Sequence, residues 1–157
     1  GRRLEECIDA MRALWAEPSA SYAGKYWSFT NVSCNPRPRE HAVPIVLGGN
    51  TDPAVRRAGR VADGWFPYTI SPDDFATQAE LLRSTARDAG RDPASIEITV
   101  WPGSYDWRAE RDPTWVRRYA DAGADRLIFV SPVAADGNLG PLRDDIARYH
   151  DDVITQL

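Results

Sequence analysis

Hydrophobic and polar positions follow two different patterns in the first 42 residues. From Arg3 to Ala16 apolar residues recur every three or four positions, which predicts one amphipathic helix over residues 1–16. Residues 17–42 contain aromatic and β-branched residues that alternate around the tripeptide AGK, followed by Pro36 and Pro38. The alternation predicts a β-hairpin, and the prolines interrupt regular structure after it. We therefore expect residues 17–42 to be an insertion between two core elements.

From residue 43 onward, short apolar strands alternate with amphipathic helices. Strands are predicted at 43–47, 64–67, 96–101 and 127–130, and the helices that follow them at 53–62, 72–89, 113–122 and 142–154. The strands are apolar without alternation, as parallel strands buried on both faces are. Gly90 and Gly123 follow two of the helices, as expected for C-caps. Four βα units over residues 43–157 fit either an open doubly wound sheet or part of a βα barrel.

Two glycines follow the first of these strands. Gly48, Gly49 and Asn50 stand between the strand and a helix that Thr51 or Asp52 is expected to cap. In both candidate folds this edge carries the ligand sites. Glycine lets the backbone approach a bulky group, and a helix N-terminus favours phosphate. The pattern fits a phosphate site or an ordinary turn, and Asp52 repels an anion unless its carboxylate turns away into the cap.

Other candidate residues lie at the neighbouring strands. Gly64, Trp65 and Phe66 come from the motif DGWF and border the same cleft, although Trp65 alone is also typical of a core residue. The segment 101–107 after the third strand is aromatic and contains a glycine, so it is either a substrate wall or a surface turn. Gly59, inside a predicted helix, is interpreted as a position where the helix packs closely on the barrel rather than as a ligand contact.

Composition narrows the classes of function. The 157 residues are enough for one domain, and the net charge of −4 gives no support to nucleic-acid binding. The apolar runs are too short for a membrane span, and the N-terminal segment does not read as a signal peptide. Two cysteines lack the spacing of metal ligands, so we expect no metal and free thiols in a cytoplasmic protein. Lys25 is the single lysine, and the other residues of the Lys and Arg total are arginines. Such a preference for arginine is associated with GC-rich actinobacterial genomes.

Acid–base candidates are few. His41 lies in the proline-rich insertion and His150 on the last predicted helix, where we expect it at the surface. No paired carboxylates and no Ser, His and Asp arrangement stand out. The catalytic residues are therefore unknown, and the chemistry is expected to come from a cofactor or from residues outside this chain.

Three segments together resemble the bacterial luciferase-like monooxygenase family. They are RRLEECIDAMRALW, YAGKYWSF and NPRPREHAVPIVLGGNTDPAVRRAGRVADGWFP, and the branch they resemble is that of the deazaflavin-dependent oxidoreductases that use coenzyme F420. The resemblance implies an α/β fold of the (βα)8 TIM-barrel type. It also implies that this chain is one C-terminal domain of about half a barrel, strands five to eight, with an inserted hairpin.

The resemblance also implies a site and a reaction. It places Leu47, Gly48, Gly49 and Asn50 in the loop that holds the cofactor phosphate, and Gly64, Trp65 and Phe66 on a strand bordering the cofactor. The implied cofactor is F420, with FMN as the alternative. The implied reaction is hydride transfer or monooxygenation of a small organic substrate.

Half a barrel leaves two sheet edges unpaired. The expected partner is therefore either a missing N-terminal half or a second copy of the chain that closes the barrel. The alternative function is a non-catalytic half-barrel module that self-associates.

Overall fold

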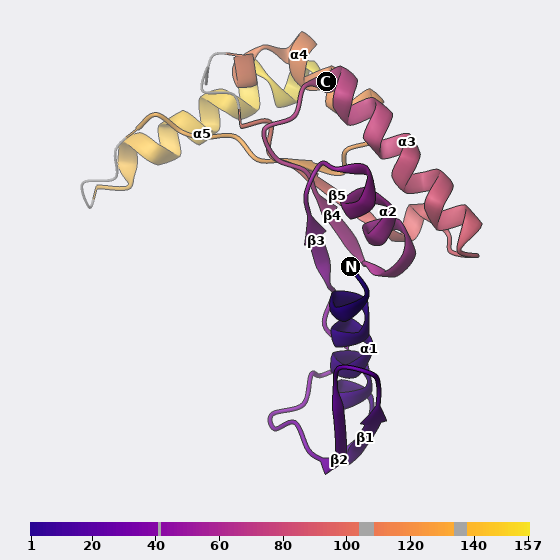
Figure 1. Cartoon of the computed structure of the whole chain (residues 1–157). Helices are drawn as coiled ribbons and strands as arrows, with labels where there is room; N and C mark the ends of the chain where they lie inside the picture. The colour runs from indigo at the N-terminus through magenta and orange to yellow at the C-terminus, as the bar shows by residue number, and fades with distance from the viewer. Residues whose placement is uncertain (41, 104–108, 134–137) are drawn as a thin grey trace.

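Four parallel strands in consecutive order form the centre of the computed structural model, which describes residues 1–40, 42–103, 109–133 and 138–157 (Figure 1). The strands are β3 (Val46–Gly48), β4 (Gly64–Phe66), β5 (Glu97–Val100) and β6 (Arg126–Leu127). All three neighbouring pairs are parallel. A doubly wound sheet reverses its strand order at a switch point, whereas this order runs in one direction, as in a barrel.

The helices follow the strands as the sequence predicts. They are α2 (Asp52–Val61), α3 (Pro72–Asp88), α4 (Pro113–Asp121) and α5 (Gly140–Asp152), with the 3-10 turns η1 (Pro93–Ser95), η2 (Ala109–Arg111) and η3 (Ile154–Gln156). Gly123 has the positive φ of 88° expected of a C-cap. The space beside it is taken by Arg83, whose Nη2 donates to the carbonyl oxygens of Ala122 (2.9 Å) and Gly123 (3.2 Å).

The outer strands are shorter than expected. Strand β3 starts at Val46 rather than residue 43, and β6 ends at Leu127 rather than residue 130. Pro44 has no N–H to contribute to a ladder. Strands β3 and β6 also stand at the two edges of the sheet, so each is paired on one side only. The apolar run after Leu127 therefore leaves the ladder early.

One face of the sheet packs against the helices and forms the core. Trp65 is fully buried and stacks on Phe75 of α3, with ring centroids 5.9 Å apart and planes 4° apart. Phe75 contacts Tyr119 of α4 at 5.4 Å, and the Tyr119 hydroxyl donates to the Ile70 carbonyl at 2.6 Å. Helices α2 and α3 lie on this side of the strands (Figure 1). This packing agrees with the expectation that Trp65, considered by itself, is typical of a core residue.

The other face of the sheet is open, so the expectation of strands buried on both faces is wrong for this chain. Leu47 packs against the core, whereas its neighbour Val46 is 53% exposed on the opposite face. Ile128 and Val130, which alternate with core-facing Leu127 beyond β6, are 41% and 48% exposed. Among the described residues, no second layer covers these side chains.

Two aspartates repeat the same contact at the amino ends of the strands. Asp63 accepts the Ile45 N–H through Oδ2 at 2.8 Å and donates its own N–H to the Ile45 carbonyl at 2.8 Å. Asp125 does the same with Ile98, at 2.7 and 2.9 Å. The similar tripeptides ADG and ADR before β4 and β6 therefore join each strand to the one before it.

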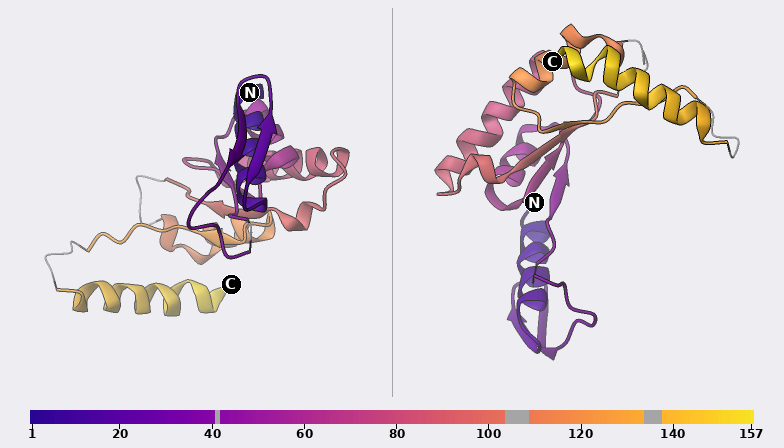
Figure 2. Two further views of the ribbon diagram at one scale, coloured as in Figure 1. Left: turned by 90° about the horizontal axis from the view of Figure 1, so that it is seen from below. Right: turned by 180° about the vertical axis from the view of Figure 1, so that it is seen from behind.

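The first 32 residues form an arm that projects from the sheet, as the two further views in Figure 2 also show. It consists of α1 (Arg2–Ala16) and an antiparallel hairpin of β1 (Ala20–Ala23) and β2 (Ser28–Val32), which confirms the predicted hairpin. Ion pairs join the arm to the body: Arg12 contacts both oxygens of Asp63 at 3.0 Å, and Glu5 contacts Arg60 at 2.6 Å.

Three further observations concern the described residues as a set. None of their helices is both long enough and apolar enough to cross a membrane. Cys7 and Cys34 are free thiols. No three His, Cys, Asp or Glu side chains among these residues come together as metal ligands.

Candidate functional site

A glycine turn at the carboxyl end of β3 opens directly onto the N-terminus of α2. Gly49 has a φ of +108°, which L side chains rarely adopt, and a Cβ there would lie 3.1 Å from the Cβ of Ala54. Backbone conformation and space therefore both require glycine at this position. The turn leaves the main chain of Gly48 to Asn50 without a large side chain between it and solvent.

The N-terminus of α2 is open to an anion. Thr51 is the N-cap, but its side chain makes no capping hydrogen bond. Pro53 follows in the first turn, where a missing N–H costs nothing. The carboxylate of Asp52 accepts a hydrogen bond from Gln78 Nε2 of α3 at 3.1 Å. Asp52 is thus held toward α3 and does not turn into the cap, so the expected condition for removing its repulsion of an anion is not met in that form.

Two side chains tie the glycine turn to the next strand and loop. The indole Nε1 of buried Trp65 donates to the Gly49 carbonyl at 3.0 Å. Asn50 Nδ2 donates to the Tyr68 carbonyl at 2.5 Å, and the Tyr68 N–H donates back to Asn50 Oδ1 at 3.3 Å. The shape of the turn is therefore set by contacts from outside it.

The structure brings some of the predicted site residues to one edge and separates others. Gly48 pairs with Phe66 at the carboxyl ends of β3 and β4, beside Gly49 and Asn50. Leu47 and Trp65 belong to the core instead. Gly64 lies at the amino end of β4, where a Cβ would be 3.0 Å from Val46 Cγ2 and 3.1 Å from the Glu97 carbonyl oxygen. Gly64 therefore permits close packing between strands.

Tyr68 is a rim residue that sequence reasoning missed. It forms a parallel bridge with Trp101, and the N–H of Thr69 donates to the Trp101 carbonyl at 2.9 Å. The Tyr68 and Trp101 side chains are 49% and 36% exposed. Pro67 had ended the predicted strand, so the alternation from Phe66 to Tyr68 was not followed. Of the predicted substrate wall at 101–107, residues 104–107 lie outside the described residues, as does His41.

A buried polar cluster lies at the exit of β6. The carboxylate of Asp145, 4% exposed, accepts hydrogen bonds from Ser131 Oγ and Arg111 Nη2, both at 2.6 Å. The Ser131 hydrogen bond lowers the pKa of Asp145 most, burial opposes it, and Arg111 adds to the lowering. Glu110, 1% exposed, accepts the Val130 N–H at 3.1 Å. No local motif predicted this cluster, because its members come from three distant segments.

Aromatic packing supports the cluster. The rings of Phe129 and Tyr149 stack with centroids 3.9 Å apart, and the Arg111 guanidinium lies 5.7 Å from each ring centroid. The carboxylates therefore hold the segment after β6 against α5. His150, the other predicted acid–base candidate, is exposed on α5 beside Asp151.

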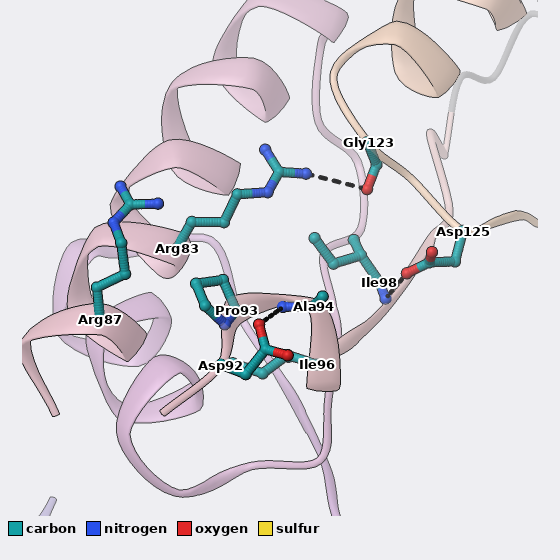
Figure 3. A pocket seen from close by; sticks show the side chains of 9 residues that line it. All are labelled: Arg83, Arg87, Asp92, Pro93, Ala94, Ile96, Ile98, Gly123 and Asp125. Carbon is teal, nitrogen blue, oxygen red and sulfur yellow. Dashed lines mark hydrogen bonds between the residues drawn. The ribbon is translucent and has the colours of Figure 1, made fainter. Parts of the chain in front are cut away.

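A cavity of about 570 Å³ lies at the opposite end of the sheet, near the amino ends of β5 and β6 (Figure 3). Its charged groups already have partners within the chain. Arg83 binds the carbonyls that end α4, and Arg87 pairs with Glu80. Asp92 caps η1 through the Ala94 N–H, while Asp125 accepts from Ile98. These contacts are structural, and the glycine turn at the other rim is the better candidate site.

Comparison with known proteins identifies relatives about twice as long as this chain. The family described as luciferase-like monooxygenase matches residues 1–145. An uncharacterised protein of Mycobacterium bovis is 31% identical over 149 residues, 93% of this chain and 49% of the relative. A phthiodiolone/phenolphthiodiolone dimycocerosates ketoreductase of Mycobacterium kansasii is 36% identical over 98 residues, 60% of this chain and 27% of that enzyme. The chain thus spans about half the length of the first relative.

Solved structures share the fold. An F420-dependent secondary alcohol dehydrogenase, bound to an F420–acetone adduct, is 17% identical with a TM-score of 0.64, over 78% of this chain and 53% of its own. The coenzyme F420-dependent tetrahydromethanopterin reductase of Methanopyrus kandleri is 17% identical with a TM-score of 0.70, over 98% of this chain and 62% of its own. The fold is therefore part of the barrel of luciferase-like enzymes. Taken with the match over residues 1–145, this shows that the chain belongs to the luciferase-like monooxygenase family.

Proposed function

We propose that this chain is part of a flavin- or deazaflavin-dependent oxidoreductase and that its glycine turn binds the phosphate of the cofactor. The observation that carries the proposal is the turn itself. Gly49 holds a positive φ at the carboxyl end of β3, and the turn opens onto a helix whose N-cap side chain is unengaged. Within the family, a main-chain surface of this kind suits an anionic group.

The residues present fit a phosphate. Pro53 has no N–H, and the Ala54 N–H donates to the Thr51 carbonyl at 2.8 Å. The N–H groups that the helix itself leaves without a partner are therefore those of Thr51 and Asp52, at the positive end of its dipole. Gly48 and Gly49 place no side chain over the turn, and Thr51 offers a hydroxyl. The nearby carboxylate of Asp52 is engaged by Gln78. This chain would therefore hold and orient the cofactor, which itself supplies hydride transfer or oxygen chemistry.

An apolar wall adjoins the turn on the open face of the sheet. Phe66 pairs with Gly48, and the partly exposed rings of Tyr68 and Trp101 follow at the next positions along the rim. Flat aromatic groups pack favourably against such side chains. We assign this wall to the cofactor ring and a small organic substrate, and expect the residues that move protons to lie in the part of the enzyme that this chain does not span.

F420 is the proposed cofactor and FMN the alternative. The two F420-dependent enzymes reach TM-scores of 0.64 and 0.70. A riboflavin lyase with modified FMN reaches 0.57 over 63% of this chain. Both kinds of cofactor carry a phosphate, so the glycine turn suits either.

The open face of the sheet is proposed to be covered by the remainder of a longer protein. Val46, Ile128 and Val130 expose apolar surface there, and the edges of β3 and β6 are unpaired. A relative of which this chain covers 49% has enough additional length for the missing strands. The alternative is the self-associating half-barrel module, in which a second copy covers the same face.

Light scattering on the chain, alone and mixed with the missing half from the longer gene, separates these assemblies. A one-to-one complex with that half supports the proposal. A stable homodimer that the added half does not displace contradicts it and favours the self-associating module.

Fluorescence titration tests cofactor binding. F420 and FMN are each added to the complex of the two halves, and to a Gly49→Ala variant of the same complex. We expect saturable changes for at least one cofactor and weaker binding by the variant. Absence of binding to both cofactors, or equal affinity in the variant, would contradict the proposal.

A further inference from the structure

The side chain of Asn50 joins two loops at the rim. Its amide donates from Nδ2 to the Tyr68 carbonyl and accepts the Tyr68 N–H at Oδ1. Both polar ends of the side chain are thus engaged with one residue of the loop that follows β4. Asparagine suits this contact because it combines a donor and an acceptor at a fixed separation.

The peptide bond before Asn50 is oriented from the other side. The Gly49 carbonyl accepts the indole N–H of Trp65, which is fully buried in the core. Among the described residues the one cis bond is Asn35–Pro36, so the Gly49–Asn50 bond is trans. In a trans peptide the C=O and the following N–H point in opposite directions. The backbone N–H of Asn50 is therefore directed away from Trp65 and out of the core.

We infer that Asn50 and Trp65 are positioning residues that aim the backbone N–H of Asn50 at the site of the anion before any ligand arrives. The inference rests on the proposed function for its ligand, but the orientation itself is a property of the free chain. Trp65 fixes the orientation of the Gly49–Asn50 peptide, and the Asn50 side chain fixes the position of the turn relative to Tyr68. A turn that is already ordered loses less conformational freedom on binding.

The connection continues into a third loop. Thr69, next to Tyr68, has a positive φ of 50°, which is uncommon for a residue other than glycine. Its N–H donates to the Trp101 carbonyl. The loops after β3, β4 and β5 are thus linked in sequence by Asn50, Tyr68 and Trp101. A change at Asn50 is expected to loosen the loop after β4 as well as its own.

Amide hydrogen exchange on the cofactor-free chain tests the orientation without any assumption about function. Asn50→Ala removes both the Oδ1 that accepts the Tyr68 N–H and the Nδ2 that donates to the Tyr68 carbonyl, and it adds no charge. Trp65→Phe removes the indole N–H while keeping an aromatic core residue. We expect Asn50→Ala to speed exchange of the Tyr68 amide about tenfold or more. Asn138→Ala, at an asparagine that caps Gly140 far along the chain, is the control. Unchanged exchange at Tyr68 in Asn50→Ala would overturn the inference.

The affinity of the same variants for FMN, measured in complex with the missing half, tests whether the orientation of the Asn50 N–H matters for binding. Both variants are expected to bind about tenfold more weakly than the unaltered complex, whereas the control variant binds as tightly. Faster exchange with unchanged affinity would overturn the positioning role. If the unaltered complex binds neither FMN nor F420, the proposed function fails, and the exchange experiment still decides whether Asn50 holds the two loops together. Asn50→Ser, whose side chain is too short to span the two loops, repeats both measurements if Asn50→Ala does not fold.

Discussion

At the scale of single residues, glycine is required at two positions for different reasons, one in the turn before α2 and one inside α2. Gly49 is required by its φ of +108°. Gly59, inside α2, is required by space: a Cβ there would lie 2.8 Å from the Leu82 carbonyl oxygen and 3.0 Å from Thr85 Cβ. Sequence reasoning predicted close packing of the helix on the barrel at Gly59, whereas the structure shows that Gly59 packs against the helix α3. The contact with α3 could not be predicted, because no local sequence pattern indicates which helix packs against α2.

Replacing Gly59 by alanine tests this packing. Alanine is favoured over glycine in a helix by about 1 kcal/mol, but forcing a methyl group into a packed contact costs about 1–3 kcal/mol. We expect a net loss in the free energy of unfolding, measured by urea denaturation. Gly140→Ala is the control, since a Cβ there approaches only the Asn138 side chain. Equal or greater stability in Gly59→Ala would contradict the close contact.

The carboxyl of Asp145 predicts a dependence of stability on pH. Its hydrogen bond from Ser131, with help from Arg111, lowers its pKa in the folded state. A group with a lowered folded pKa stabilises the protein above its unfolded pKa, and this contribution is lost as pH falls through the folded pKa. Urea denaturation between about pH 6 and about pH 3 should therefore show less acid destabilisation in Asp145→Asn than in the unaltered chain. Identical pH profiles would contradict the role of Asp145.

At the scale of elements, the hydrophobic periodicity predicted which helices and strands form better than it predicted where they begin and end. The helix predicted at 72–89 is α3 (Pro72–Asp88), because its apolar positions and the Ser71 cap are both local. The strand predicted at 127–130 is only Arg126–Leu127, because among the described residues β6 is an edge strand that pairs with β5 alone, and this pairing ends at Leu127. The cluster of Glu110, Asp145 and Ser131 went unpredicted for a similar reason, since it depends on contacts between distant segments.

Two adjacent residues at the end of β6 provide a test of which side of the sheet is buried. Leu127 packs against the core, whereas Ile128 is 41% exposed on the open face. Burying an unpaired charge is among the most destabilising changes, so Leu127→Asp should cost about 3 kcal/mol or more. Ile128→Asp should cost much less in the isolated chain. Thermal and urea unfolding of both variants measure the difference, and equal losses would contradict the sidedness of the sheet.

At the scale of the whole molecule, the chain is a set of βα units with one covered and one open face. The sequence predicted parallel strands correctly, because their apolar runs and turn glycines are local signals. It also predicted burial on both faces, whereas among the described residues one face stays exposed, as Val46 and Ile128 show. The candidate site was predicted in part: Gly48, Gly49, Asn50 and Phe66 share the rim. Which side chains orient the turn could be learned only from the contacts of Trp65 and Tyr68.

The central claim is that the glycine turn holds a cofactor phosphate, and nitrogen–proton correlation NMR tests it most directly. FMN and riboflavin share their ring system and differ in the phosphate, so the pair isolates that group. On the complex of the two halves, with only this chain isotopically labelled, we predict that FMN shifts the backbone amide signals of Gly49, Asn50 and Thr51 saturably. Riboflavin should leave those three signals in place. Equal shifts with both ligands, or FMN shifts confined to other residues, would contradict the account.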